Sequence, residues 1–396
     1  MSQTANPSLS YLHQHADELI SIRHRIHQHP ELAFEEFATS DLVSEKLTHW
    51  GYQVERGLGG TGVVGQLRRG HSNKRLGLRA DMDALPIEEK SGVAYASRRT
   101  GVMHACGHDG HTAMLLGAAQ YLAQHGEFSG TLNLIFQPAE EGGGGAVRMM
   151  DEGLFSKYPC DAVFAMHNGP GVPQGHLVFR DGPMMASSDY VTITLHGVGG
   201  HGAEPHRTAD PIVAASSIVM ALQTIVSRNA HPMDMAIVTV GALHSGKANN
   251  VIPDTAILEL SVRALTHEVR ELLERRIKAL VTAQADSFGV RAEIDYRRGY
   301  AVLVNTLVET DFARQVALEV VGPDKTVLHG PAITASEDFS FMLEKVPGCY
   351  LIIGNGDGAG GCAVHNPGYD FNDGNLVVGA AYWARLTERF LATTAT

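Results

Sequence analysis

The chain has 396 residues, and this length predicts two or three domains rather than a single core. Its apolar content of 44% and its charged content of 19% are those of an ordinary globular protein. The formal net charge of −12 argues against a nucleic-acid partner, because the chain has no basic surplus to neutralise phosphates.

The ends and the cysteines of the chain suggest an intracellular protein. We find no apolar run of the ~18 residues that a membrane span needs. The N-terminus also lacks the basic start and apolar segment of a secretory signal. Cys160, Cys349 and Cys362 fit no disulfide or zinc-ribbon spacing, so we interpret them as reduced thiols of the core or of loops. We therefore predict no membrane association and a cytoplasmic location.

Short apolar strands alternate with helices along the first part of the chain. Helical patterns cover residues 10–29, about 38–50 and about 110–125, and AVRMMDEG adds another. The strand-like runs are VVGQLR, RLGLRAD, LNLIF and DAVFAMHN. This alternation predicts an α/β fold with a largely parallel sheet flanked by helices.

A different pattern begins near residue 187. YVTITLHG alternates apolar and polar residues, as a strand with one solvent-exposed face does. The order that follows, helix, two strands, helix and strand, predicts a ferredoxin-like βαββαβ unit. The first pattern then returns. We therefore predict a catalytic domain from residues 1–186 and 299–396, interrupted by an inserted lid or dimerisation domain at 187–298.

Carboxylate, imidazole and thiol side chains follow three of the predicted strands or lie in the MHACGHDGH segment between two of them. They are Asp81, Cys106, His108, Glu140, Glu141 and His167. Ligands gather outside the carboxyl ends of strands in α/β sheets, and these side chains bind divalent transition metals. His104 and His111, which flank the pair Cys106 and His108, are interpreted either as residues that support the ligands or as surface residues. The alternative for MHACGHDGH as a whole is a His-rich start of a helix with no metal. The set as a whole favours a metal-dependent enzyme.

Two adjacent carboxylates, Glu140 and Glu141, precede a run of glycines. Such neighbours repel each other unless a cation or a shared proton relieves them. With a metal present, one carboxylate can coordinate while the other accepts a proton from water. An exposed acidic turn is the alternative. A phosphate-binding loop is excluded, because two carboxylates would repel phosphate and no GxGxxG or GxxxxGK motif is present.

Several motifs resemble one known family in order and over almost the whole chain. RHRIHQHPELAFEE, RADMDALP, MHACGHDGH, QPAEEGGGGA, MHN and GGHGAEPH look like the amidohydrolase branch of the aminoacylase and carboxypeptidase G metallopeptidases. That branch includes hippurate hydrolase, N-acetyl-amino-acid deacetylases and plant auxin-conjugate hydrolases. The family fold is a metallopeptidase α/β domain that carries a βαββαβ lid or dimerisation domain.

The resemblance implies a pair of divalent metal ions and a role for each residue near them. The implied metal ligands are Cys106, His108, Glu141, His167 and His365. Glu140 would be the general base, and Asp81 the carboxylate that orients a ligand imidazole. Other branches have His where Arg79 stands and Asp where Cys106 stands. A thiolate ligand favours softer ions. Members of the resembled family are found with zinc, manganese, cobalt or nickel, so the resemblance implies one of these metals.

Three residues of the predicted inserted domain also match the family. The resemblance assigns Asn250 and Arg263 to the substrate carboxylate, and His201 to the oxyanion of the reaction. From the residues alone, the alternative is a turn residue for Asn250, a surface strand charge for Arg263 and a surface imidazole on a flexible loop for His201.

The predicted function is metal-dependent hydrolysis of N-acyl-amino acids to a carboxylic acid and an amino acid. The alternative is a dipeptidase or carboxypeptidase that uses the same binuclear site. A metal-binding protein without catalysis is a third hypothesis, but it should lack the base or a ligand, and neither is missing. The sheet edges of the inserted domain favour a homodimer.

Overall fold

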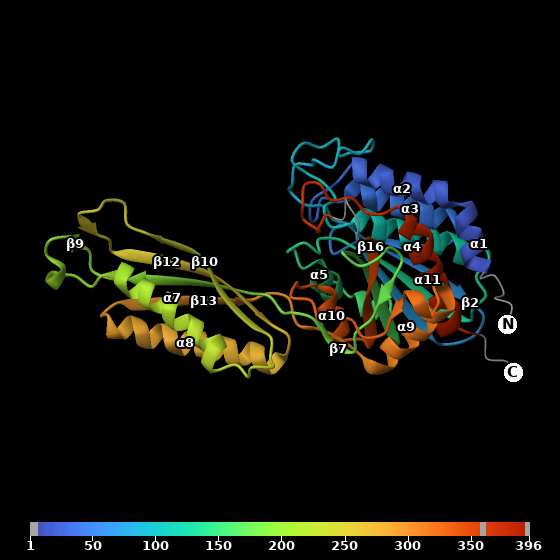
Figure 1. Ribbon diagram of the computed structural model, residues 1–396. Helices are drawn as coiled ribbons and strands as arrows, with labels where there is room; N and C mark the ends of the chain where they lie inside the picture. Colours follow the sequence, from blue (N-terminus) through green and yellow to red (C-terminus); the bar gives the residue numbers. More distant parts are fainter. Residues whose placement is uncertain (1–6, 357–361, 393–396) are drawn as a thin grey trace. The chain divides into compact units, whose positions relative to one another are not determined.

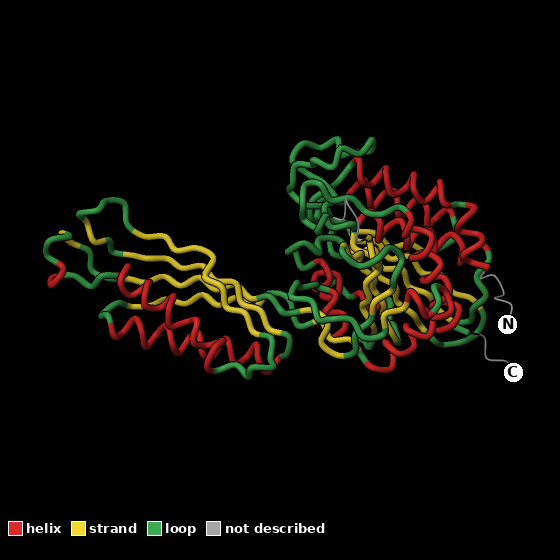
Figure 2. The backbone as a smooth tube through the Cα atoms, in the orientation of Figure 1, coloured by secondary structure: helices red, strands yellow, loops and turns green. Residues whose placement is uncertain are grey.

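The computed structural model describes residues 7–356 and 362–392, and the chain divides into two compact units. The first unit consists of Met1–Gly182, Val304–Pro331 and Phe341–Thr396. The second consists of Pro183–Leu303 and Ala332–Ser340. Figures 1 and 2 show helices and strands in both units.

A mixed sheet of eight strands forms the middle of the first unit. In spatial order these strands are β1 (Gln53–Leu58), β2 (Gly62–Arg69), β4 (Gly130–Gln137), β3 (Arg75–Asp81), β5 (Ala162–Pro170), β16 (Gly348–Gly356), β6 (Leu177–Val178) and β15 (Thr326–Val327). The four central strands, from β4 to β16, run parallel, so their carboxyl ends meet at one edge. The predicted α/β fold is confirmed, but the sheet is mixed because β1, β2 and β6 pair antiparallel.

Helices flank this sheet. They are α1 (Pro7–Gln14), α2 (Ala16–Gln28), α3 (Phe37–His49), α4 (His108–Gln124), α5 (Gly145–Asp151), α6 (Leu154–Lys157), α9 (Leu307–Val320) and α11 (Gly374–Phe390), with α10 (Phe339–Leu343) at a unit boundary and a short 3₁₀ turn at Pro323–Lys325. The helix predicted at 10–29 is two helices, because the chain leaves the helical path at His15, whose Nδ1 lies 2.9 Å from the carbonyl oxygen of Tyr11.

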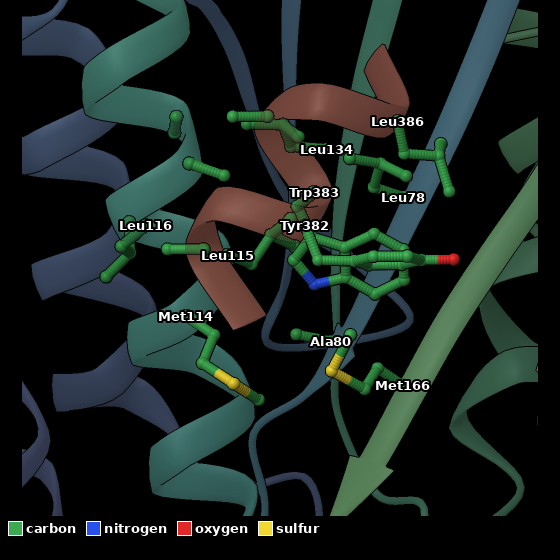
Figure 3. Packing of buried hydrophobic residues seen from close by; sticks show 14 of the residues in the cluster. Leu78, Ala80, Met114, Leu115, Leu116, Leu134, Met166, Tyr382, Trp383 and Leu386 are labelled. Carbon is green, nitrogen blue, oxygen red and sulfur yellow. The ribbon is translucent and has the colours of Figure 1, made fainter. Parts of the chain in front are cut away.

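Helix α4 is the central helix of the first unit, and it carries His108 at its first residue. It is buried over most of its length and packs against α2, α11 and β3. Figure 3 shows Met114, Leu115 and Leu116 of this helix beside Tyr382 and Trp383 of α11. This packing fixes the position of the helix, and therefore of His108, relative to the strand ends.

The second unit has the strand and helix order β-α-β-β-α-β. Its elements are β8 (Asp189–His196), α7 (Pro211–Arg228), β10 (Ala236–Ser245), β12 (Thr255–Ala264), α8 (His267–Ser287) and β13 (Arg291–Arg298). The strands lie in the order β10-β12-β8-β13, and all neighbours are antiparallel. Apolar residues of the sheet and of both helices form one core, which includes Ile193, Ile218 and Ile277.

Smaller elements complete the fold. A two-stranded ribbon joins β9 (Gly200–His201) to β11 (Val251–Ile252), and a 3₁₀ turn covers Pro205–Arg207. A separate pair contains β7 (Gly182–Met185) and β14 (Leu303–Asn305).

Among the helices of the described residues, α7 alone is long and apolar enough to cross a membrane by length and composition. Its Ala214, Ile218 and Leu222 are buried in the core of the second unit, which is the pattern of a helix packed on a sheet.

Candidate metal centre and active site

Three parallel strands bring predicted site residues to one edge of the sheet. β3 ends at Asp81, β4 is followed by Glu140 and Glu141, and β5 contains His167. Because β4, β3 and β5 are parallel neighbours, these side chains meet where the strands end. The loop before α4 adds Cys106.

The side chains at this edge form two triads of possible metal ligands that share one thiol. Ligand atoms of Cys106, His108 and His167 lie within 4.8 Å of one another, and so do those of Cys106, Glu141 and His365. Cys106 Sγ lies 3.4 Å from His167 Nε2, and His365 Nε2 lies 3.1 Å from Glu141 Oε1. Thiolate, imidazole and carboxylate are suitable donors for a divalent transition metal.

Hydrogen bonds determine which ring nitrogen each histidine presents. His108 donates from Nδ1 to Asp83 at 3.1 Å, and His167 donates from Nδ1 to the carbonyl oxygen of Asn168 at 2.7 Å. Nε2 of each ring is therefore left with a lone pair for a metal. Within residues 7–356 and 362–392, the buried Nε2 of His108 has no hydrogen-bond partner. A bound cation would satisfy this atom, so the donor set fits a metal.

His111 lies beside these ligands but presents no free nitrogen. Its Nδ1 donates to Asp81 at 2.6 Å, and its Nε2 accepts the backbone N–H of Asn168 at 3.0 Å. It could bind a metal only by losing one of these bonds. His111 is therefore a supporting residue of the site and not a ligand.

The charged groups around Cys106 favour the binding of a cation. Burial raises the pKa of the Cys106 thiol, and the nearby carboxylates of Glu141 and Glu140 raise it further. Burial alone would lower the pKa of His108, but Asp81 and Asp83 outweigh it and raise the pKa to about 10. A divalent ion reverses both preferences, because it stabilises the thiolate and the neutral imidazole.

The carboxylate next to His108 is Asp83, which the sequence reasoning missed. Asp81, expected to orient a ligand imidazole, is hydrogen-bonded to His111 and to Arg79, the latter at 2.7 Å. Its closest approach to a proposed ligand is 3.8 Å, from Oδ2 to His108 Nε2. RADMD places two carboxylates two residues apart, but which of them reaches the ligand depends on the path of the chain after β3.

Unusual backbone conformations surround the site. Gly107 separates Cys106 from His108 with φ +89°, and a Cβ there would lie 2.3 Å from Asn168 Nδ2. Among the described non-glycine residues, positive φ occurs at His365 (67°), at Ala139 (52°), which precedes Glu140, and at Phe34 (64°). One of these positions is the candidate ligand His365 and another directly precedes Glu140, so two of the three lie at the candidate site, where such backbone conformations cluster.

The second unit brings two of its three predicted site residues together. His201 pairs with Val251 in the β9–β11 ribbon, and the carbonyl oxygen of Asn250 accepts the N–H of Gly202 at 2.8 Å. Arg263 lies near the other end of β12 and donates to the carbonyl oxygen of Thr334 at 3.2 Å. The eight residue-to-residue steps from Thr255 to Arg263 span about 26 Å of extended strand. Asn250 and Arg263 of one chain are therefore too far apart to bind one small carboxylate.

Comparison with known proteins identifies the family. The model of Peptidase family M20/M25/M40 matches residues 77–389. Hippurate hydrolase of Campylobacter jejuni is 45% identical over 94% of this chain and 97% of its own length. N-acetyl-L-cysteine deacetylase of Bacillus subtilis is 38% identical over 97% of this chain and 90% of its own length. The chain belongs to the M20/M25/M40 peptidase family.

A solved structure of the same family has the same fold. The YXEP protein of Bacillus subtilis, a dinuclear metal binding peptidase, superposes on this M20 chain with a TM-score of 0.84. The two sequences are 31% identical, and the match covers 96% of this chain and 100% of that one. With these relatives and the ligand clusters, the chain is an M20 hydrolase that uses divalent metal.

Proposed function

We propose that this M20 hydrolase cleaves the amide bond of N-acyl-amino acids and releases a carboxylic acid and an amino acid. The observation that carries the proposal is the pair of ligand triads around Cys106, with the carboxylate of Glu140 beside them. The named activities of the relatives support it, because hippurate and N-acetyl-cysteine are both N-acyl-amino acids.

Two divalent ions would be held at this site. Cys106, His108 and His167 would hold one ion, and Cys106, Glu141 and His365 the other. Thiolate and imidazole donors favour zinc, whereas the carboxylate suits manganese, so zinc, manganese, cobalt and nickel are the candidate ions. When bound, such ions make water more acidic and polarise the substrate carbonyl.

Glu140 would act as the general base. Its carboxylate is 7% exposed and approaches ligand atoms of His108 and Glu141 to within 4.8 Å. From there it can take a proton from the attacking water and return it to the nitrogen of the leaving amine. The tetrahedral intermediate carries an oxyanion, for which His201 would supply a donor, while Asp81 would keep His111 and Arg79 in place.

The second unit suggests that the site is completed by two copies of the chain. His201 and Asn250 lie in or beside the ribbon before β12, and about 26 Å of β12, from Thr255 to Arg263, separates that end of the strand from Arg263, whereas an N-acyl-amino acid is much smaller. If all three residues contact the substrate, Arg263 must act together with His201 of the partner subunit. The outer strands β10 and β13 have free edges within the unit that a homodimer could pair.

Mixing two inactive variants tests this arrangement. Chains with Glu140→Gln and chains with His201→Ala are unfolded, mixed and refolded together, and turnover is compared with that of each variant alone. Recovery towards about a quarter of wild-type turnover supports action in trans, because half of the dimers are mixed and each mixed dimer has one competent site. No recovery in mixed dimers assigns His201 to its own chain. Light scattering on the same samples tests the predicted dimer.

Amine release tests the activity itself. Metal-free protein is incubated with hippurate, N-acetyl-amino acids and dipeptides, with Mn²⁺, Zn²⁺, Co²⁺ or Ni²⁺ added separately. We expect hydrolysis of acyl-amino acids that chelation abolishes and metal restores. Cys106→Ala should lose metal and activity, while Cys160→Ala, which removes a thiol outside the triads, should keep both. Full turnover without metal would refute the proposal.

The second candidate function is a dipeptidase or carboxypeptidase at the same site. The peptidase among the solved relatives supports it. The two functions differ in whether the substrate has a free α-amine. Faster cleavage of dipeptides than of their N-acylated counterparts would favour the peptidase. The cytoplasmic location remains a prediction, which cell fractionation can test.

A further inference from the structure

Glu36, from the motif RHRIHQHPELAFEE, is a buried carboxylate that lies outside the two ligand triads. Its side chain is 0% exposed. One oxygen, Oε1, accepts the backbone N–H of Ala139 at 2.9 Å, and the other, Oε2, accepts the hydroxyl of Thr61. Ala139 directly precedes Glu140. A carboxylate 103 positions away in the sequence therefore contacts the turn from which the proposed general base projects.

Ala139 has a backbone conformation that residues with a side chain rarely adopt. Its φ is +52°, in the left-handed region. The residue is 0% exposed, so its backbone groups need partners within the protein. Glu36 accepts its N–H, and its carbonyl oxygen accepts the N–H of Gly145 at 3.1 Å. Such a conformation persists only where its surroundings hold it, so the turn should relax when the Glu36 acceptor is removed.

The segment that carries Glu36 is itself held in place. Glu31 of the same motif accepts the N–H groups of Ala38 and Thr39 at the start of α3, each at 2.9 Å. Thr61 is 3% exposed and fixes the second oxygen of Glu36 from the loop between β1 and β2. Glu36 is therefore a fixed acceptor to which the turn after β4 is bound.

We propose that Glu36 is a positioning residue for the general base, because it holds the turn at Ala139 from which Glu140 reaches the attacking water. This inference rests on the proposed function, in which Glu140 takes the proton of that water. A displacement of about 1 Å from a reacting geometry can lower the rate about 10²-fold. The ligand Glu141 has a separate anchor, since its N–H donates to Asp83 at 2.9 Å. Removal of Glu36 should therefore lower kcat and leave the metal bound.

Two replacements at position 36 separate the role of the acceptor from the role of the charge. Glu36→Gln keeps an acceptor oxygen for Ala139, and its NH₂ group can donate to the hydroxyl of Thr61. Glu36→Leu has a similar volume but no acceptor. We expect Glu36→Gln to keep kcat within about twofold of the wild type, and Glu36→Leu to lower it about 10- to 100-fold with KM nearly unchanged.

A double-mutant cycle with Glu140→Gln gives a readout that a merely structural role would not move. In the Glu140→Gln background no base remains to be misplaced, so the addition of Glu36→Leu should change the residual kcat by less than about twofold. A general loosening of the site would lower kcat by the same factor in both backgrounds. Each variant is loaded with the ion that supports wild-type turnover, and its metal content is measured by elemental analysis.

Three further variants control for the motif, for stability and for failure to fold. Glu35→Leu removes the neighbouring exposed carboxylate, which pairs with Arg99, and should leave kcat unchanged. Tyr52→Phe removes a buried hydroxyl that donates to the carbonyl oxygen of Ala119 at 3.0 Å, so it should lower the melting temperature and leave kcat unchanged. Glu36→Asp shortens the side chain by a methylene and should also lower kcat. It replaces Glu36→Leu in the cycle if circular dichroism shows that Glu36→Leu does not fold.

The outcomes separate this inference from the proposed function. The positioning role is overturned if the folded Glu36→Leu or its Glu36→Asp substitute keeps normal kcat, loses metal, or lowers kcat equally in both backgrounds. A loss in Glu36→Gln as large as that in Glu36→Leu overturns the role of the acceptor. If Glu140→Gln keeps wild-type turnover, the proposed base and this inference fall together. If only dipeptides are cleaved and the cycle on them is non-additive, the proposed substrate is wrong and the role of Glu36 stands.

Discussion

The metal centre of the first unit and the ribbon of the second unit hold their polar side chains in opposite ways. Cys106 and His108 are 7% and 0% exposed, and the imidazoles of His108 and His167 are oriented by the hydrogen bonds that they donate to Asp83 and to the carbonyl oxygen of Asn168. His201 is exposed, and its Nδ1 accepts the N–H of Ala203 at 3.0 Å. The first arrangement is a preorganised network, whereas the second leaves its side chain accessible to another molecule.

This difference separates two kinds of functional residue. A buried polar network is stable only when its members satisfy one another, so a change in one member affects both metal binding and folding. An exposed loop residue carries little of the folding energy, so its removal affects function alone. The four experiments below test this distinction, starting with the largest expected effect.

Glu140→Gln should have the largest effect on turnover. Glutamine keeps the shape of the side chain but cannot accept the proton, so we expect turnover to fall by about 10²- to 10⁴-fold. Metal content, measured by elemental analysis, should stay near that of the wild type. Glu141→Gln should instead lose metal. If the two variants behave in the reverse way, their roles have been exchanged.

His201→Ala should reduce turnover by about 10²- to 10³-fold, because the oxyanion loses a donor. Since His201 is exposed, metal content and melting temperature should not change. His206→Ala is the matched control, because it removes another exposed imidazole from the same unit. Near-normal turnover of His201→Ala would show that the ribbon has no chemical role. A lower melting temperature would show that it is part of the folded core.

Gly107→Ala should weaken metal binding and lower the stability of the first unit, because Gly107 lies between the candidate ligands Cys106 and His108. A methyl group there meets Asn168 Nδ2 at 2.3 Å and Tyr369 Oη at 2.5 Å, and φ is +89°. We expect metal affinity to fall at least about tenfold, together with a lower melting temperature. Gly92→Ala has a similar φ of +76° but meets nothing within 4 Å, so it measures the backbone cost alone. Equal metal binding by both variants would contradict the expectation.

Much of the site could be predicted because strand ends leave a clear signal. Apolar runs followed by Pro or Gly located the ends of β3 and β4, and parallel neighbours bring such ends together. Asp83 could not be distinguished from Asp81, because the direction of its side chain depends on the path after β3, where Ala84 pairs with Leu32. That pairing joins residues 52 positions apart, and no local pattern reports it.

The second unit shows a different limit of sequence reasoning. Asn250 and Arg263 are 13 positions apart in the sequence, and both fit the family motifs, so one shared role was a natural expectation. The extended strand β12 between them keeps them apart in space. Separation along a strand follows from its length at about 3.3 Å per residue, so this distance could have been estimated once β12 was recognised.

The smallest expected effect is a dependence of stability on pH, from charges buried beside the metal centre. Arg23 donates to Asp109 at 2.7 Å and to Asp373 at 3.0 Å. His27 lies between two carboxylates, with Nδ1 2.9 Å from Asp109 and Nε2 3.2 Å from Glu89. Burial alone would lower the pKa of His27, but hydrogen bonds to Asp109 and Glu89 outweigh it and raise the pKa to about 9.

Because the folded pKa of His27 lies above the unfolded value of 6.5, the charged imidazole stabilises the folded chain. This stabilisation is complete below about pH 6.5 and is lost as the pH rises through about 9. The pKa shift of His27 corresponds to at most about 3 kcal/mol in the free energy of unfolding. Denaturant unfolding of metal-loaded protein between pH 6 and about 9.5 should show that the free energy of unfolding falls as the pH rises, and His27→Gln should reduce this pH dependence.

His206→Gln, in the exposed part of the second unit, should leave the slope of the free energy of unfolding against pH unchanged. Equal slopes for wild type and His27→Gln would mean that the buried network is not protonated at His27, and that Arg23 alone balances its carboxylates.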